Sequence, residues 1–116
     1  MTETVYNYIG GQWKLSRSGA TFESLNPATA SVLANVVSSD ADDVADAVAA
    51  AKAAYPSWRN TPAPRRGEIL YKVAQVLTER KEELSRILTQ DMGKVISEAR
   101  GDVQEAIDMA YYMGGE

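Results

Sequence analysis

The hydrophobic and polar positions divide the chain into an amino-terminal part with strand character and a longer part with helical character. In the first part, short runs of aromatic and β-branched residues alternate with turn residues, which is typical of strands. Gly10-Gly11 lies between two such runs, residues 6–9 and 12–15, and glycine tolerates the positive φ angles of a tight hairpin. Further strands are predicted at Thr21–Leu25 and at residues 32–37. These runs predict a small antiparallel meander of short strands.

From Ser39 onward the apolar residues recur with helical spacing. Ser39 and Asp42 predict a capping box at the start of a first helix. We expect this helix to end near Tyr55, because Pro56 disfavours helical geometry in the residue before it. Its inward face is predicted to carry Val44, Val48, Ala51 and Tyr55.

The remaining residues predict two or three more amphipathic helices. One begins at Thr61-Pro62, is interrupted by a polar joint at residues 80–83, and stops near Gly93; another begins near Ser97. The expected inward residues are Ile69, Leu70, Val73, Val76 and Leu77, then Leu84, Ile87 and Leu88, then Val103, Ala106, Ile107 and Ala110. The whole pattern predicts an α+β fold, with short antiparallel strands followed by three to four amphipathic helices.

Composition narrows the class of protein. The chain has 116 residues, 45% of them hydrophobic, and a net charge of −4 without an extended basic cluster, so nucleic acid is an unexpected partner. It contains no cysteine and no histidine, which excludes from these residues the commonest nucleophile pairs and most zinc sites. No signal peptide and no run long enough to span a bilayer is present, so we expect a soluble cytoplasmic protein without a membrane partner.

A search for motifs that carry chemistry is mostly negative. No phosphate-binding loop, dinucleotide-binding turn or metal-ligand spacing is present. Carboxylates gather at residues 40–43 and near Glu82, and we interpret them as a solvated helix start and a charged helix surface rather than as catalytic acids. We interpret the aromatic side chains as packing residues, and these are Tyr6, Tyr8, Trp13, Tyr111 and Tyr112.

The order of local motifs resembles the amino-terminal part of the aldehyde dehydrogenase superfamily. The resemblance extends from Tyr6 to the last residue of the sequence. The segments that carry it are Tyr8-Ile9-Gly10-Gly11-Gln12-Trp13, Asn26-Pro27-Ala28-Thr29, residues 50–58, Arg66-Gly67 with Leu70, Asp91-Met92-Gly93-Lys94, residues 98–103 and Tyr111-Tyr112.

This resemblance implies an oxidoreductase that oxidises an aldehyde to a carboxylic acid with NAD or NADP, through a cysteine thiolate and a thioester. In the family the cysteine, an oxyanion-hole asparagine, a glutamate base and the cofactor-binding turn all lie downstream of the matched region. The chain is therefore expected to have no catalytic and no cofactor-binding residue, to bind no cofactor alone, and to be inactive by itself. The aldehyde substrate and a homo-oligomeric state are expected for the parent enzyme.

Two smaller sets of site residues follow from the resemblance. A structural monovalent cation would be held at the positions of Ser24, Leu25 and Asp91. Arg100 and Gln104, four residues apart on one helix face, correspond to positions that line the substrate tunnel. An arginine there suits an acidic semialdehyde, because its planar fork binds a carboxylate at two points. The alternative for Arg100 is a surface ion pair with acidic residues such as Asp102 or Glu98.

The domain organisation expected from the resemblance is one fragment, residues 1–116. It would be part of the larger α/β fold of the parent and pack on the parent's cofactor-binding domain, with the catalytic and oligomerisation domains absent. Two alternatives stay open from the residues alone. One is a truncated or independent α+β module that acts through protein–protein interaction. The other is a small enzyme that uses its carboxylates.

Overall fold

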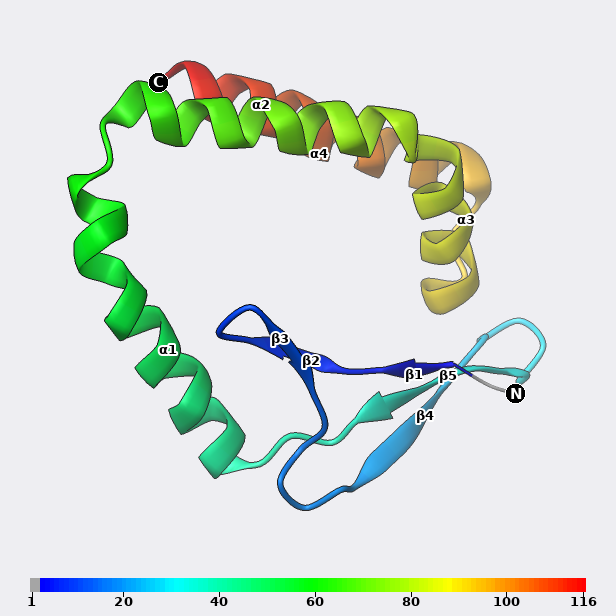
Figure 1. The fold of residues 1–116 in the computed structure, drawn as a ribbon. Helices are drawn as coiled ribbons and strands as arrows, with labels where there is room; N and C mark the ends of the chain where they lie inside the picture. The colour runs from blue at the N-terminus through cyan, green and yellow to red at the C-terminus, as the bar shows by residue number, and fades with distance from the viewer. Residues whose placement is uncertain (1–2) are drawn as a thin grey trace. The chain divides into compact units, whose positions relative to one another are not determined.

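The computed structural model describes residues 3–116, which form two compact units that divide between Asn60 and Thr61. The first unit contains all the strands of the described residues and helix α1, and the second contains helices α2, α3 and α4 (Figure 1). This composition confirms the predicted α+β class. In the described part of the chain, no helix is both long and apolar enough to cross a membrane.

The strands of the first unit form two separate sheets. Strands β1 (Thr4–Val5), β5 (Val32–Val37) and β4 (Thr21–Leu25) form one sheet, in that order, and β2 (Asn7–Ile9) pairs with β3 (Gln12–Lys14) in the other. β4 and β5 are antiparallel, but β1 runs parallel to β5. The predicted meander is therefore wrong. A strand of two residues carries no visible alternation, and its pairing with a distant strand has no local sequence signal.

The β2–β3 hairpin confirms the turn predicted at the two glycines. Gly10 and Gly11 have φ angles of 61° and 80°, as a two-residue hairpin turn with positive φ at both central positions requires. The pairing places Tyr8 opposite Trp13, and their ring centroids are 4.8 Å apart. Because Tyr8 is 61% and Trp13 70% exposed, these aromatic side chains pack on each other and not in a core of this unit.

Helix α1 (Ala41–Asn60) begins one residue later than the predicted capping box implies. Asp40 is the capping residue, since its Oδ1 accepts hydrogen bonds from the backbone N–H groups of Asp42 (2.9 Å) and Asp43 (3.1 Å). Asp43 Oδ2 in turn accepts from the Asp40 N–H at 3.0 Å. Ser39 instead exchanges hydrogen bonds with the side chain of Asn7. The box is thus Asp40–Asp43, because an aspartate caps as well as a serine and lies directly before the helix.

The expected end of α1 at Tyr55 is also wrong, because the helix continues through Pro56 to Asn60. A proline removes one backbone N–H donor, but the residues after it keep their N–H groups and can continue the helical hydrogen bonds. Ser57 Oγ donates to the Ala54 carbonyl at 2.9 Å and adds a local contact beside the interruption. The predicted inward face of α1 is exposed, with Val44 at 58% and Tyr55 at 57%.

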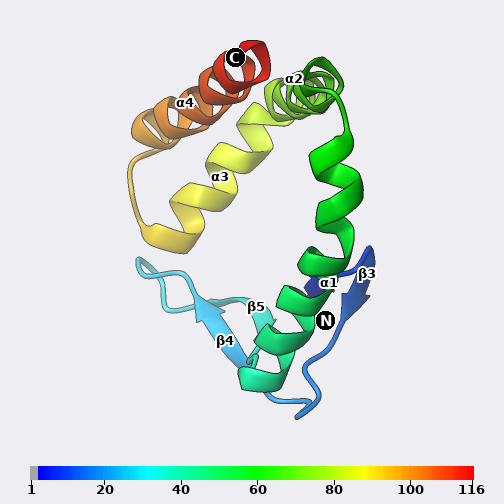
Figure 2. The same ribbon diagram turned by 90° about the vertical axis from the view of Figure 1, so that its left-hand side faces the viewer.

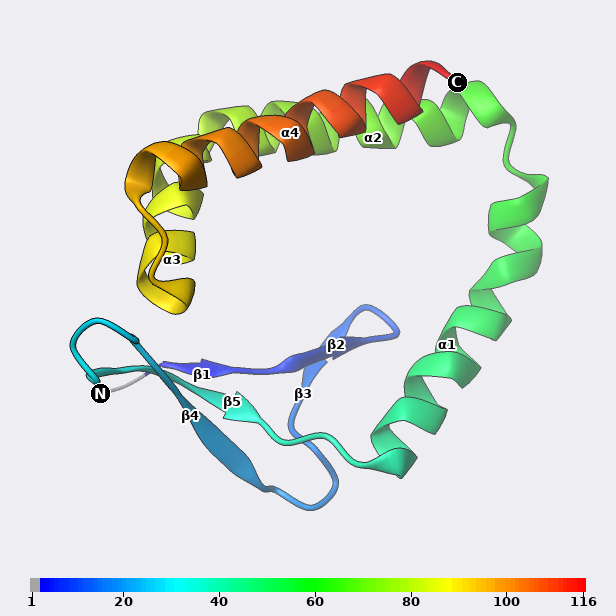
Figure 3. The same ribbon diagram turned by 180° about the vertical axis from the view of Figure 1, so that it is seen from behind.

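In the second unit, α2 (Ala63–Glu79) and α4 (Ile96–Gly115) lie side by side and run in opposite directions (Figure 3). α3 (Lys81–Met92) follows α2 directly and leads back through a short loop into α4 (Figure 2). The break at Arg80 and the stop at Gly93 agree with the predicted joint and helix end. Gly93 has a φ of 77°, and its N–H donates to the Thr89 carbonyl at 2.9 Å.

The core of this unit lies between α2 and α4. Its buried residues are Ala74, Val103, Ile107 and Ala110, with Leu77 and Leu84 packed against them. Ala106 was expected inside but is exposed, because the inward stripe of α4 steps by four residues from Val103 to Ile107. The predicted stripe of α2 is divided: Leu77 packs against the core and Leu70 is half-buried, whereas Ile69, Val73 and Val76 are 47%, 42% and 50% exposed.

The backbones of α2 and α4 come close together at Gly67 and Gly114. A Cβ atom added to Gly67 would lie 2.3 Å from the Gly114 carbonyl oxygen. The Tyr71 side chain and the Gly67 carbonyl oxygen lie 3.0 Å and 3.2 Å from the position of a Cβ added to Gly114. Glycine is needed at Gly67 because two backbones meet there without room for a side chain.

Candidate substrate-recognition site

Arg100 lies near the start of α4 and reaches across to the first turn of α3. Its Nε donates to Glu82 Oε2 at 2.9 Å and its Nη2 donates to Glu82 Oε1 at 2.7 Å, which is a two-point arginine–carboxylate pair. The hydrogen bond lowers the pKa of Glu82 below its usual value and raises that of Arg100. Both groups are therefore charged at neutral pH.

Gln104 follows Arg100 by one helical turn and contacts the same part of α3. Its Oε1 accepts a hydrogen bond from Lys81 Nζ at 2.7 Å, and its Nε2 donates to Asp108 Oδ1 at 2.8 Å. Lys81 and Glu82 are neighbours in the sequence, and they hold two α4 residues that are four apart. The two residues predicted to line the substrate tunnel thus lie on one face of α4 and are fixed by the start of α3.

The alternative expected for Arg100, a surface ion pair, is present, but its partner is Glu82 and not Asp102 or Glu98. Asp102 accepts a hydrogen bond from Lys94 Nζ, and the carboxylate bound to Arg100 is that of Glu82, 18 residues earlier in the sequence. Residues one or two positions apart on a helix do not face each other, so Asp102 and Glu98 could not pair with Arg100. Glu82 was missed because its proximity depends on how α3 packs against α4, which no local pattern records.

The surroundings of this pair carry more positive than negative charge. Arg86 Nη2 lies 3.4 Å from Glu82 Oε1, and Lys81 also lies close enough to lower the pKa of Glu82. The Arg100 side chain is 45% exposed and that of Glu82 53%, so water screens these charges. We define Lys81, Glu82, Arg86, Arg100 and Gln104 as the α3–α4 polar cluster. Its chemistry suits the binding of an anion.

The residues predicted to hold a cation lie in different units. Ser24 and Leu25 are at the end of β4, where the pairing with β5 has a register shift, and Asp91 is in the last turn of α3. Among the described residues, no group of three or more histidine, cysteine, aspartate or glutamate side chains could hold a metal ion. A site formed by these three residues stays a prediction.

Asp43 was expected to be a solvated carboxylate, but it is only 5% exposed. Besides the Asp40 N–H, it accepts hydrogen bonds from Ser16 Oγ at 2.5 Å and from the Arg17 N–H at 3.3 Å. These donors, Ser16 first, lower the pKa of Asp43 below its usual value. The carboxylate attaches the loop after β3 to the start of α1, so its role in this unit is structural.

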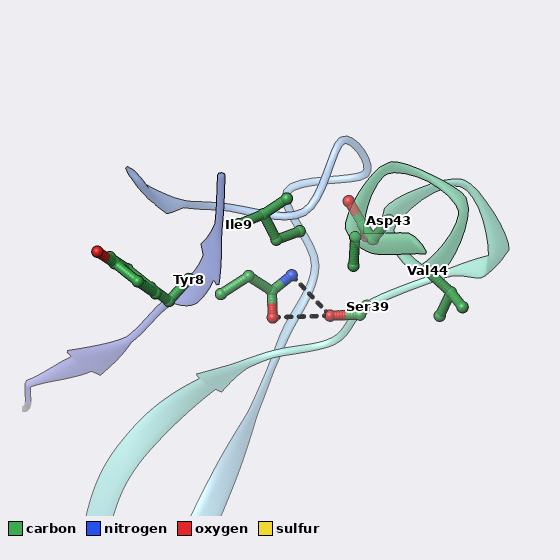
Figure 4. A pocket seen from close by; sticks show the side chains of 7 residues that line it. Tyr8, Ile9, Ser39, Asp43 and Val44 are labelled. Atoms are coloured by element: carbon green, nitrogen blue, oxygen red, sulfur yellow. Dashed lines mark hydrogen bonds between the residues drawn. The ribbon is translucent and has the colours of Figure 1, made fainter. Parts of the chain in front are cut away.

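A cavity of about 240 Å³ opens beside Asp43, between the hairpin and the start of α1 (Figure 4). Its walls are mostly apolar, and two of the polar side chains there, Asn7 and Ser39, are hydrogen-bonded to each other. The lining residues are Asn7, Tyr8, Ile9, Ser39, Asp43, Val44 and Ala47. Asp43 is the one carboxylate among these lining residues and its oxygens already accept hydrogen bonds, so this cavity offers no pair of carboxylates for acid–base chemistry.

The arrangement of strands and helices is that of a known class of oxidoreductase. An NAD-dependent aldehyde dehydrogenase from Sinorhizobium meliloti superposes with a TM-score of 0.93 at 30% identity, over 99% of this chain and 24% of that one. The model of the aldehyde dehydrogenase family matches residues 13–116. The chain belongs to the aldehyde dehydrogenase family, and the predicted resemblance and fold are confirmed.

Curated relatives are similar over nearly the whole chain. It is 49% identical over 113 residues to malonate-semialdehyde dehydrogenase 2 of Geobacillus kaustophilus, covering 97% of this chain and 23% of the relative. It is 46% identical over 117 residues to the alpha-ketoglutarate semialdehyde dehydrogenase of Haloferax volcanii, covering 100% and 24%. The chain thus spans about a quarter of the length of the curated relatives it matches.

Proposed function

We propose that this chain is part of an NAD(P)-dependent aldehyde dehydrogenase that oxidises an aldehyde carrying a second, acidic group. The observation that supports the acidic substrate is the position of Arg100 on α4, at a site that the family resemblance assigns to the substrate tunnel. Two relatives of high identity are named for semialdehydes that carry a carboxylate. A guanidinium group is well suited to hold such a carboxylate while the aldehyde end reacts elsewhere.

The chain's own contribution to the reaction is to bind and orient the substrate. The distal carboxylate would pair with Arg100, and Gln104 would line the same wall one turn further along α4. The nicotinamide cofactor, NAD or NADP, supplies the acceptor for the hydride of the aldehyde. The residues that hold the cofactor and form the thioester are expected in the remaining three quarters of the enzyme, and so are the contacts of a homo-oligomer.

We further propose that the exposed apolar faces of α1 and α2 pack on the remainder of the enzyme, including its cofactor-binding domain. These faces carry Val44, Val48 and Tyr55 on α1 and Ile69, Val73 and Val76 on α2, all more than 40% exposed. Apolar patches of this kind mark contact surfaces. The chain alone should therefore self-associate and unfold over a broad range of urea concentration. A sharp unfolding transition of a monomer would contradict this and favour an independent interaction module.

Substitution of Arg100 tests the proposed substrate class. In the enzyme expressed from the complete reading frame, Arg100→Met should lower kcat/KM for malonate semialdehyde relative to propanal, an aldehyde of equal chain length without the carboxylate. We expect this kcat/KM to fall about 10- to 100-fold, because the substitution removes a hydrogen bond between two charged groups. Arg65→Met is the matched control, because Arg65 forms an exposed ion pair with Glu68 on α2. An equal loss for both aldehydes would refute the role of Arg100.

A further inference from the structure

The guanidinium group of Arg100 has two edges that can each bind a carboxylate at two points. One edge is formed by Nε and Nη2, and the other by Nη1 and Nη2. Glu82 occupies the first edge, through bonds of 2.9 Å from Nε and 2.7 Å from Nη2. Its two oxygens make no bond to Nη1. The second edge thus keeps the geometry that a second carboxylate requires.

We propose that Glu82 is a positioning residue for Arg100: it holds the Nε–Nη2 edge so that the Nη1–Nη2 edge faces the distal carboxylate of the substrate. This inference rests on the proposed function, since it needs Arg100 to meet an acidic aldehyde. It adds that substrate selectivity depends on a residue of α3 that does not itself touch the substrate.

The structure around Glu82 supports this role. Glu82 is the second residue of α3, where a negative charge is favoured by the unpaired N–H groups of the helix start. Ser85, three residues after Glu82, is fully buried, and its Oγ donates to the Lys81 carbonyl at 2.7 Å. The first turn of α3 is therefore fixed by packing. A carboxylate on a rigid turn restricts the long side chain of Arg100 before substrate arrives, which lowers the entropy cost of binding.

The negative charge of Glu82 does not neutralise all the positive charge around Arg100, so Arg100 can still attract an anion. Arg86 lies on the other side of the carboxylate, at 3.4 Å from Oε1, so the three side chains together carry a net positive charge. The Lys81–Gln104 bond holds the next turn of α4 to the same end of α3. The α3–α4 polar cluster thus combines a net positive charge with a fixed orientation of Arg100.

A simple competition between Glu82 and substrate predicts the opposite effect. If Glu82 only occupied Arg100 and had to be displaced, its removal would strengthen the binding of an acidic aldehyde. If Glu82 positions Arg100, its removal weakens that binding. The sign of the change in KM therefore separates the two accounts, and a role in stability alone would alter acidic and neutral substrates equally.

The test uses the Glu82→Gln substitution in the enzyme expressed from the complete reading frame. We expect KM for malonate semialdehyde to rise about 2- to 10-fold, the cost of one long side chain that must be ordered on binding. KM for propanal and kcat for both aldehydes should stay at the values of the unsubstituted enzyme. A fall in KM for malonate semialdehyde, no change, or a parallel rise for both aldehydes would each overturn the proposal.

Glu83→Gln is the matched control. Glu83 is the next residue of the same helical turn, and it forms an equivalent two-point pair with Arg80, at 2.9 and 2.6 Å. Its substitution removes the same charge from the same helix start but leaves Arg100 paired, so both KM values should be unchanged. An increase in KM for malonate semialdehyde as large as that of Glu82→Gln would overturn the positioning role.

The double substitution Glu82→Gln with Arg100→Met shows whether the effect passes through Arg100. In the Arg100→Met enzyme, Glu82→Gln should leave the ratio of the two KM values unchanged, and a remaining effect would refute the mechanism. The two proposals also fail differently. If Arg100→Met itself leaves the preference for acidic aldehydes intact, the proposed function is wrong. If Arg100→Met abolishes the preference but Glu82→Gln does not alter it, only the inference about Glu82 is wrong.

Discussion

Replacement of Gly67 by alanine should destabilise the helical unit, although alanine is the better helix former. The new Cβ would lie 2.3 Å from the carbonyl oxygen and 3.3 Å from the carbonyl carbon of Gly114. Both are backbone atoms, so no side-chain rotation relieves the clash. α2 and α4 would have to separate by about 1 Å to restore an ordinary contact distance. The buried contacts of Ala74 and Ala110 would loosen with them.

The expected magnitude is the balance of two opposing effects. Overpacking against rigid neighbours costs about 1–3 kcal/mol, and we take the upper part of this range because the neighbour is backbone. Alanine regains about 1 kcal/mol over glycine in a helix interior. The helical unit should therefore lose about 1–2 kcal/mol of stability, which corresponds to a factor of about 5–30 in the population of its open form.

Hydrogen exchange followed by mass spectrometry measures this change without requiring a cooperative transition. In the Gly67→Ala chain, amides of α2 and α4 should exchange about 5- to 30-fold faster than in the unsubstituted chain. Gly101→Ala is the control, since no heavy atom lies within 4 Å of its added Cβ, and it should slow exchange in α4 by up to about 5-fold. Unchanged or slower exchange in Gly67→Ala would refute the close helix contact.

Other substitutions test further details of the two units. Asp43→Asn should speed hydrogen exchange in the loop at residues 16–20. The pKa of Asp43 is lower in the folded chain than in the unfolded chain, where it is about 4. The difference in exchange rate between the two chains should therefore be complete above about pH 4 and shrink as the pH falls through the lowered pKa of the folded chain. A difference that grew in acid would contradict the assignment. Thr89 Oγ1 is buried without a hydrogen-bond partner, so Thr89→Val should leave exchange in α3 unchanged or slower. Thr78→Val, which removes a 2.8 Å bond to the Ala74 carbonyl, should speed exchange in α2. Pro56→Ala should raise the helix signal in circular dichroism, because it restores one backbone donor inside α1, and a loss of signal would show that α1 ends earlier.

The sequence predicted the features that depend on a few neighbouring residues. The hairpin turn at Gly10-Gly11 and the helix end at Gly93 both follow from the conformational freedom of glycine. The segment at Asn26-Pro27 is of the same local kind, since Asn26 Oδ1 accepts a hydrogen bond from the Ala28 N–H at 2.9 Å. Each of these signals acts within three or four residues, so the local structure that it predicts does not depend on how distant segments pack.

The features that sequence patterns missed depend on contacts between distant segments. The parallel pairing of β1 with β5 joins Thr4 to Asn35, and the pair between Glu82 and Arg100 crosses from α3 to α4. An apolar stripe on a helix also does not show which of its residues pack against a neighbouring helix. α2 has apolar residues over a wide arc, of which Leu77 packs against the core whereas Val73 is 42% exposed.

The most direct test of the central claim is the substrate preference of the enzyme expressed from the complete reading frame. The absorbance of reduced nicotinamide would give kcat/KM for malonate semialdehyde and for propanal, with NAD and with NADP in turn. The account predicts turnover with at least one cofactor and a clear preference for the acidic aldehyde, which Arg100→Met removes. A preference for propanal, or no reduction of either cofactor with any aldehyde, would contradict it.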